Sequence, residues 1–350
     1  MRLKTTVTLA AVVALSVVTG VLHYTDAEPV ATFVVAGAAL AGLAWVIAVA
    51  TETVGRRFGP AATGVLQSTL GNLPELFVVL FALSAGEVVV AKTSIVGSLL
   101  ANALFVLGLA IVAGARKASD GVMTFKRRLP NDTATLLLLA VFIIALLGVS
   151  DRVGDRASRH QLAISVVGAI FLLAVYGAWL WSYLREPEQA SVEVEAREHV
   201  HFRAAIAMLA AGGVAAALVS DWFVGALDPA IKTIGISKAF TGLVVVGIAG
   251  NAVENVVGIW LAAKGQADLA ISVVKNSVAQ IAVFLFPALV LLSLFFSHRL
   301  TFVLGPVYVI ALVLMALAVW QITGDGKAVV FEGMALVTLY VVVATLAYYE

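Results

Sequence analysis

The amino-acid sequence predicts an all-α integral membrane protein with about 11 transmembrane helices, arranged as one N-terminal helix and two inverted five-helix repeats. The first observation is composition, because 62% of the 350 residues are hydrophobic and only 12% are charged. A soluble domain has roughly a quarter of its residues charged. The second observation is a series of apolar runs long enough to cross a bilayer. The third is a short pattern, G-N-x-x-E, that occurs at residues 71–75 and again at 250–254.

The individual helices are predicted from runs of about 20 apolar residues, the length that crosses the hydrocarbon core. The first run is longer than the apolar segment of about 7–15 residues in a secretory signal, so we interpret it as a transmembrane helix. Turn residues or charged residues separate the runs. The predicted helices span residues 6–23, 30–51, 61–85, 89–114, 133–149, 160–184, 203–220, 238–263, 267–292, 300–320 and 329–349.

The distribution of charge divides the chain into four parts. Residues 1–29 hold the extra helix, 30–184 the first repeat, 185–202 an acidic linker and 203–350 the second repeat. With a cytoplasmic N-terminus, fourteen lysines and arginines fall on the cytoplasmic side and six outside, which favours that orientation and an external C-terminus. Because five is odd, the second repeat enters the membrane from the opposite side. We expect a cell inner membrane of the bacterial type, and a cytoplasmic linker that is either a solvated connection or an acidic regulatory segment.

Glu75 and Glu254 are the candidate functional carboxylates. Each lies near the middle of a predicted membrane helix, where an ionised side chain is costly and by default marks an ion or proton path. Ser68, Asn72 and Glu75 share one helix face. Pro74 is expected to kink that helix and free a backbone carbonyl, whereas no proline interrupts the second repeat. Carboxylate, amide and carbonyl oxygens are the ligands that Ca²⁺ takes.

The helices that follow each glutamate supply weaker polar groups. Ser98 and Asn102 are four residues apart, as are Asn276 and Gln280, with Ser277 beside them. These side chains either line the cation site with Asn72 and Asn251 or simply hold helices together, as polar residues do in membranes.

The remaining titratable residues limit the classes of function that the sequence supports. Glu52 and Asp221 are expected to end the first helix of each repeat, either as carboxylates on an access path or as boundary charges. The chain has no cysteine, and no histidine lies deep in an apolar run. Without a nucleophile–base pair or a phosphate-binding motif, an enzyme is not expected. The net charge of +1 gives no indication of a nucleic-acid partner.

The motifs together resemble a known family. G-N-x-x-E-L followed by G-S-x-x-x-N, and G-N-x-x-E followed by S-x-x-Q-I-A-x-F-x-x-P, are similar to the two alpha-repeats of the cation/proton exchanger branch of the calcium/cation antiporter superfamily. The resemblance implies alternating-access exchange of Ca²⁺ for H⁺ with no resident cofactor. It implies that Glu75 and Glu254 bind the metal and the protons. It implies assistance from Asn72, Asn251, Ser98, Asn102, Ser277 and Gln280.

Lys275 is a departure from the family pattern, which has an apolar residue before the small residues of the second repeat. A lysine inside a membrane helix costs about 2.5–3.5 kcal/mol on insertion scales. Helical spacing places it about 160° from Ser277, so we expect it to point away from the central face. If Lys275 faced the site instead, it would modulate cation binding. Its presence also favours an alternative function as a Na⁺(K⁺)/H⁺ antiporter on the same fold. A cation channel is a further alternative, without a pore-like motif to support it.

Several properties stay open at the level of sequence. The transported ions are expected to be Ca²⁺ and H⁺, with Na⁺ or K⁺ as alternatives, and the partners are these ions and the lipid bilayer. The sequence does not determine the cation selectivity, the ratio of protons to cations or the role of residues 185–202. The oligomeric state also stays open, a homo-oligomer included.

Overall fold

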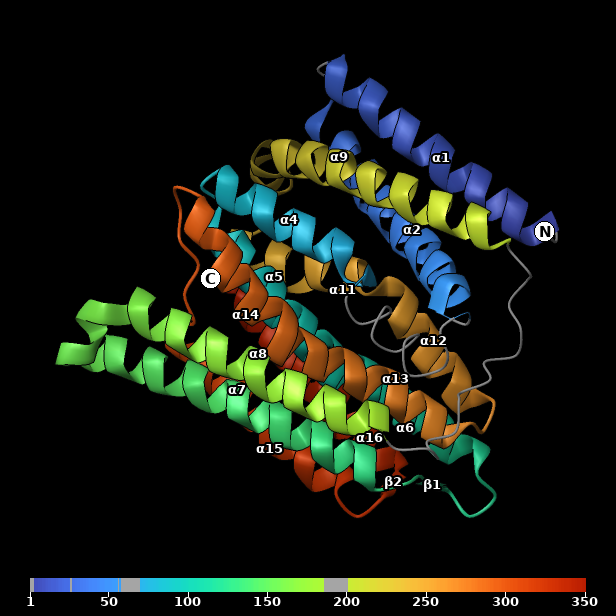
Figure 1. Ribbon diagram of the computed structural model, residues 1–350, viewed down its shortest axis with the longest axis vertical. Coiled ribbons are helices and arrows are strands. Elements are labelled where there is room, and N and C mark those ends of the chain that lie inside the picture. Colours follow the sequence, from blue (N-terminus) through green and yellow to red (C-terminus); the bar gives the residue numbers. More distant parts are fainter. Residues whose placement is uncertain (1–2, 26, 56, 58–69, 186–200) are drawn as a thin grey trace.

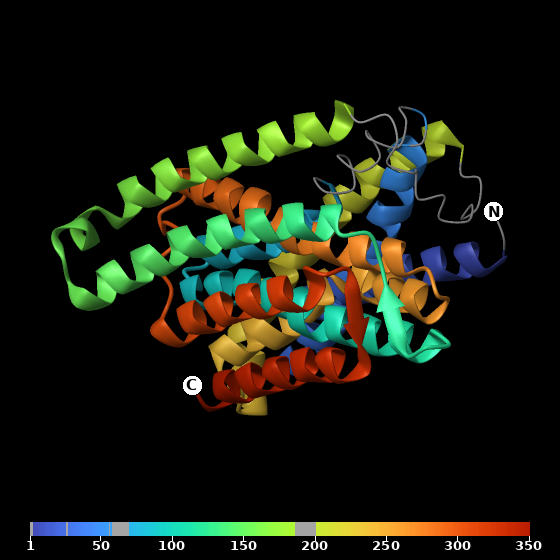
Figure 2. The ribbon, with the colours of Figure 1, turned by 90° about the horizontal axis from the view of Figure 1, so that it is seen from below.

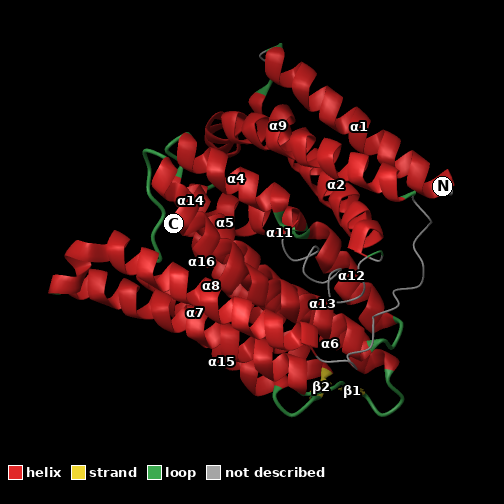
Figure 3. Cartoon of the chain, viewed as in Figure 1, coloured by secondary structure: helices red, strands yellow, loops and turns green. Residues whose placement is uncertain are grey.

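The computed structural model describes residues 3–25, 27–55, 57, 70–185 and 201–350. Almost every described element is a helix (Figure 3). Among these residues, nine helices are long and apolar enough to cross a membrane, or ten when one bent pair is counted as a single span. The predicted helix 61–85 is described only in its second part, so the count of eleven stays a prediction. The acidic linker and Ser68 lie outside the described residues.

The helices of the N-terminal part follow the predicted order. The first is α1 (Leu3–Tyr24), and α2 (Pro29–Gly55) follows it. The shorter α4 (Leu73–Ser84) leads into α5 (Val88–Leu100), which continues through the π-helix η1 (Ala101–Val106) into α6 (Leu107–Lys117). The long helices α7 (Arg128–Val153) and α8 (Gln161–Arg185) come next, joined by the 3₁₀ helix η2 (Arg156–His160).

The C-terminal part has the same order of elements. Its first helix is α9 (Phe202–Ile234). A broken span follows, made of α10 (Lys238–Phe240), the π-helix η3 (Thr241–Val246), α11 (Gly247–Gly250) and α12 (Ala252–Ala263). The next span comprises α13 (Ala267–Gln280), the π-helix η4 (Ile281–Leu285), α14 (Phe286–Leu292) and the 3₁₀ helix η5 (Ser293–Phe295). The last two helices are α15 (Pro306–Thr323) and α16 (Val330–Tyr349).

The helices form two regions. The first helices of the two parts, α2 and α9, pack against each other along much of their length, and α1 packs on both of them (Figure 1). The remaining helices surround α5, η1 and α6, most of whose side chains are buried. Figure 2 shows α7 and α8 projecting as a hairpin at one end of the molecule, with the two short strands at the other end.

Three details of the elements differ from the predicted ones. The helical fold carries one small sheet, in which β1 (Val122–Thr124) pairs antiparallel with β2 (Lys327–Val329) and joins two loops that are far apart in sequence. The helix predicted at 300–320 begins only at Pro306. Before it, the backbone N–H groups of Leu300 and Phe302 donate to serine hydroxyls from other segments, which holds this stretch outside a helix.

The third correction concerns α9, which does not end near Asp221 as predicted but runs on to Ile234. Its later charges are paired, because Lys232 forms an ion pair with Asp228 one turn earlier at 2.6 Å. The helix instead ends where Gly235 adopts a left-handed conformation with φ of 77°. This conformation suits glycine because it has no Cβ, and it commonly ends helices.

The two halves meet at a very close helix crossing. A Cβ added to Gly97 on α5 would lie 2.2 Å from the carbonyl oxygen of Leu243 on η3. A Cβ on Gly247 would lie 2.6 Å from the carbonyl carbon of Gly97. Only glycine allows the two backbones this approach. The crossing therefore places α5 directly beside the broken span that carries Asn251 and Glu254.

Candidate cation site

Both G-N-x-x-E peptides lie where a helix is interrupted. Asn72 precedes α4 with φ −90° and ψ 11°, and Asn251 separates α11 from α12 with φ −110° and ψ 17°. These angles fall in the sparsely occupied bridge region, where many active-site residues are found. The segments on either side of Asn251 are bent by 62°. The second break occurs without a proline, so a break at this peptide does not require one. Pro74 itself lies in the first turn of α4, where proline is tolerated.

The two breaks place each glutamate in the first turn of a helix. Glu75 is the third residue of α4, and Glu254 is the third residue of α12. The first turn has free N–H groups and the positive end of the helix dipole, which favour negative charge. Interrupted helices with their ends near the membrane midplane are a common way for transporters to build an ion site.

Glu75 is completely buried and lies against the second half of the chain. Its Oε2 accepts a long hydrogen bond of 3.5 Å from Nδ2 of Asn251, and its Cβ is 3.5 Å from where a Cβ on Gly250 would be. Asn251 also donates to the carbonyl of Gly247, to which the hydroxyl of Ser98 donates as well. The other oxygen, Oε1, has no hydrogen-bond partner among the described residues. A buried carboxylate oxygen of this kind is available to a cation or a proton.

Glu254 has the corresponding place in the second half but is partly exposed. Its Oε2 accepts a hydrogen bond from the hydroxyl of Ser277. The carboxylate lies close enough to Glu75 for the two charges to repel each other. The structure therefore brings together the two glutamates that the sequence singled out, each with a serine from the next helix of its own half.

The amide side chains complete this region. Asn251 donates to the carbonyl of Gly247 at 3.3 Å, while its own Oδ1 has no partner among the described residues. Asn102 is 1% exposed, and neither polar atom of its side chain has a partner there. Asn72 is also buried, and the hydroxyl of Ser98 lies 3.5 Å from the carbonyl of Gly247. Buried polar atoms are nearly always hydrogen-bonded, so several unpaired ones together indicate a site for an ion or water.

Two π-helices occupy corresponding places next to the site. Asn102 is the second residue of η1, and Gln280, which is partly exposed, directly precedes η4. A π-helix shifts the hydrogen-bond pattern by one residue and is frequent at functional sites. The sequence analysis missed both π-helices because these segments have the apolar composition of an ordinary membrane helix.

The chemistry of the donors suits a hard cation. The available atoms are carboxylate, amide, hydroxyl and backbone oxygens, which are the ligands of Ca²⁺. Among the described residues, no three His, Cys, Asp or Glu side chains cluster around one point. A cation between Glu75 and Glu254 would therefore depend on neutral oxygens such as those of Asn251 and Asn102 for its remaining ligands.

Three other candidate residues belong to neighbouring helices. The ammonium of Lys275 donates to the carbonyl of Pro130 and the hydroxyl of Thr323, both at 2.8 Å, and so points off the central face as expected. Asp221 is exposed within α9, and Glu52 is half-buried in the last turn of α2. A role of Glu52 and Asp221 in ion access stays a prediction.

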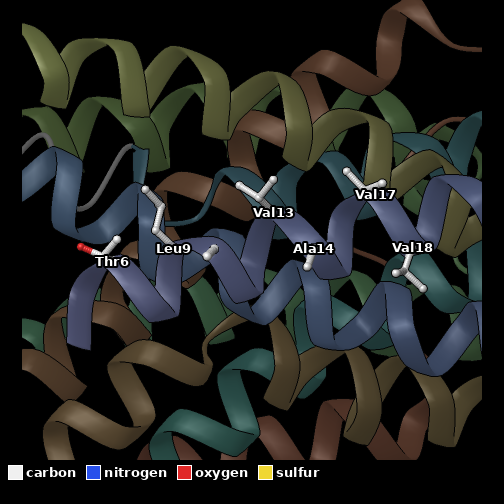
Figure 4. A pocket seen from close by; sticks show the side chains of 7 residues that line it. Thr6, Leu9, Val13, Ala14, Val17 and Val18 are labelled. Atoms are coloured by element: carbon white, nitrogen blue, oxygen red, sulfur yellow. The ribbon is translucent and has the colours of Figure 1, made fainter. Parts of the chain in front are cut away.

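A shallow hollow on the outer face of α1 is unrelated to the site (Figure 4). All but one of its lining side chains are apolar, and none is a carboxylate or an amide. They belong to Thr6, Leu9, Ala10, Val13, Ala14, Val17 and Val18. This surface offers a cation no ligands.

The fold and the site can be compared with known proteins. The sequence profile of the sodium/calcium exchanger protein family matches residues 28–184 and 204–349. The chain belongs to this family. It is 31% identical over 344 residues to the Ca²⁺/H⁺ antiporter ChaA of Bacillus subtilis, with 96% of each chain covered. It is 30% identical over 340 residues to the Ca²⁺/H⁺ antiporter of Aphanothece halophytica, covering 92% of this chain and 91% of that one.

Solved structures in the family share the fold. The structure of native YfkE superposes with a TM-score of 0.81 and 28% sequence identity, covering 98% of this chain and 99% of that chain. The H⁺/Ca²⁺ exchanger CAX superposes with a TM-score of 0.77, covering 99% and 92%, and at 16% identity it supports the fold alone. The protein is thus a membrane protein with the fold of the family's exchangers, and its similar proteins are transporters.

Proposed function

We propose that this protein is a secondary transporter, not an enzyme, that exchanges Ca²⁺ for H⁺ by alternating access around Glu75 and Glu254. The observation that carries the proposal is the meeting of these two carboxylates, each in the first turn of an interrupted helix and each from a different half of the chain. The names of the similar proteins ChaA and the Aphanothece antiporter support Ca²⁺ and H⁺ as the transported ions. No resident cofactor is needed, because both ions are substrates.

Exchange follows from competition for the two carboxylates. Burial away from water favours the neutral, protonated form of a carboxyl group. A divalent cation compensates two negative charges at once, so its binding displaces protons from its ligands. The protein can then change its access from one side of the membrane to the other in two forms, with protons bound or with the metal bound. An exchange of two protons for one Ca²⁺ would be electroneutral.

Access would alternate through a movement of α2 and α9. These helices pack mainly on each other and present one face to α4 and to the interrupted span (Figure 1). Sliding of this pair would open the site to one side while closing it to the other. The glutamates would stay in place, since α4 leads into α5, α12 belongs to the same span as η3, and α5 and η3 are held together by the glycine crossing.

The direction of transport depends on the orientation in the membrane. The lysine and arginine distribution supports a cytoplasmic N-terminus and an external C-terminus in an inner membrane of the bacterial type. With an inward proton gradient, the protein would export Ca²⁺ from the cytoplasm. In this orientation the α4–α5 turn is external and the β1–β2 sheet is cytoplasmic.

Transport in proteoliposomes tests the proposal. Purified protein is reconstituted with a Ca²⁺-sensitive dye, and a pH gradient is imposed across the membrane. We expect pH-driven Ca²⁺ movement with matching proton flux in the wild type and its loss in Glu75→Gln and Glu254→Gln. Absent Ca²⁺-coupled flux in the wild type, or undiminished flux in both variants, would refute the proposal. Flux driven only by Na⁺ or K⁺ would identify the alternative antiporter, although Lys275, which favoured it, lies away from the site.

A further inference from the structure

Lys275 is a charged residue whose place in the protein the exchange reaction does not explain. It lies on α13 with only 3% of its surface exposed. None of the described acidic residues forms an ion pair with it. A buried charge is costly unless it is paired or hydrogen-bonded. The contacts that offset this cost should therefore indicate what the residue does.

Those contacts join three helices. Nζ of Lys275 donates to the carbonyl oxygen of Pro130, near the start of α7, and to Oγ1 of Thr323, the last residue of α15, each at 2.8 Å. Thr323 in turn donates to the carbonyl of Val319 at 2.7 Å. One ammonium group thus fixes the position of α13 relative to α7 and α15, which belong to different halves of the chain.

A second lysine makes the corresponding contact at another place in the fold. Lys92 on α5 donates to the carbonyl oxygen of Val303 at 2.7 Å, three residues before α15 begins. In the order of elements, α5 and α13 are equivalent, and so are α7 and α15. Each lysine therefore links the third span of its own half to the N-terminal end of the fourth span of the other half.

Both linked helices also carry a serine next to one of the glutamates. Ser277 lies two residues after Lys275, and its hydroxyl donates to Glu254. Ser98 lies six residues after Lys92, and its hydroxyl donates to the carbonyl of Gly247, which also accepts from Asn251, the partner of Glu75. Side chains two positions apart in a helix point about 160° away from each other. Lys275 therefore contacts the helices behind α13, while Ser277 faces the carboxylate.

We propose that Lys275 and Lys92 are positioning residues for the cation site. Each anchors the helix whose serine orients one glutamate, Lys275 acting through Ser277 on Glu254 and Lys92 acting through Ser98 on Glu75. This inference rests on the proposed function, because it assigns the two lysines a role in the affinity of that site. It makes each lysine specific for the glutamate of its own half.

Double-mutant cycles measure this specificity. The variants are Lys275→Met, Lys92→Met, Ser277→Ala and Ser98→Ala, singly and in the four lysine–serine combinations, and the readout is the KM for Ca²⁺ at a fixed pH gradient. Residues that act through one another depart from additivity, whereas distant independent sites do not. We expect Lys275→Met to change KM at least about 3-fold less in the Ser277→Ala background than in the wild type. The same is expected of Lys92→Met in the Ser98→Ala background. The crossed pairs should combine multiplicatively.

Further variants separate positioning from general stability. Lys275→Gln keeps an N–H donor without the charge, so it should recover part of the KM lost in Lys275→Met. Lys232→Met removes an exposed lysine that pairs only within α9, and it should leave KM unchanged. If Lys275→Met fails to fold, Lys275→Gln and the Lys92 cycle still decide the question.

Some outcomes would overturn the inference. Equal coupling in all four pairs would mean that the lysines act only on general stability, and so would multiplicative behaviour throughout. An unchanged KM in both lysine variants would exclude any effect on the site. A wild type without Ca²⁺-driven proton flux would refute the proposed function alone. The same cycles would then be measured on the shift in melting temperature produced by the cation that stabilises the wild type most.

Discussion

Glu75 and Glu254 occupy the same position in their helices but have different surroundings. Glu75 is sealed by the other half of the chain, with Gly250 and Asn251 against it, and no part of it is exposed. Glu254 is held by Ser277 from its own half and is partly exposed. The comparison teaches that a repeated peptide supplies equivalent chemistry, while the packing around it decides how deeply each glutamate is buried and which half of the chain contacts it.

The largest effect is expected from removing either charge. Glu75→Gln and Glu254→Gln should each raise the KM for Ca²⁺ at least about 30-fold, because an interaction with a charged group contributes roughly 2 kcal/mol or more. Flux in proteoliposomes measures this, with Glu28→Gln, far from the site in sequence, as the control. A large loss in only one of the variants would break the equivalence of the two glutamates and point to a site with one essential carboxylate.

The glycine crossing should not tolerate a larger residue, whereas a helix glycine with open space around it should. Gly97→Ala places a Cβ 2.2 Å from the carbonyl oxygen of Leu243, so α5 and η3 must separate. Overpacking of this kind costs about 1–3 kcal/mol or more. The melting temperature of the purified variant should fall, and transport should fall with it. Gly213→Ala on α9 meets no atom within 4 Å and should be neutral or slightly stabilising.

Removing the hydrogen bond between the halves at Glu75 should have a smaller effect on transport. Asn251→Ala removes the amide that donates to Oε2 of Glu75, and we expect KM for Ca²⁺ to rise about 10-fold, as for the loss of a hydrogen bond to a charged group. Asn255→Ala is the control, because Asn255 lies four residues later, in α12, and donates to the backbone carbonyl of Ile248. Equal effects of the two substitutions would show that the amide at 251 has no special relation to Glu75.

The smallest effect is expected where the two halves differ at the helix turns. Gly86 and Gly265 form the same left-handed turn with φ of 80° and 79°, but Glu87 follows the first and Gln266 the second. Glu87 accepts two hydrogen bonds of 2.8 Å from Lys238, which also pairs with Asp228. Because these groups are partly exposed, Glu87→Gln should cost about 1 kcal/mol or less.

Salt dependence distinguishes this ion pair from packing. The decrease in melting temperature of Glu87→Gln relative to the wild type should become smaller at high ionic strength, because salt screens partly exposed charges. Lys232→Gln serves as the control, since its ion pair with Asp228 lies within one helix. A loss that persists unchanged in concentrated salt would indicate that Glu87 acts through packing.

Much of the fold follows from local pattern, and the departures from it have identifiable causes. The apolar runs predicted most spans, because length and hydrophobicity act locally. Pro306 and the hydroxyls of Ser165 and Ser293 shortened α15, and paired charges extended α9 beyond Asp221. Only the contact with Ser165 comes from far away in the sequence; the others are local features that the apolar runs alone did not reveal.

For the candidate site, the sequence by itself determined which residues are available. The repeated G-N-x-x-E peptide identified Glu75 and Glu254, because a carboxylate in an apolar run is too costly to be there without a role. Only the tertiary structure decided that Asn251 reaches across to Glu75, that a helix breaks at Asn251 without a proline, and that Lys275 faces Pro130 and Thr323. The physical reason is that side-chain chemistry is fixed residue by residue, whereas contacts and burial are set by the packing of distant helices.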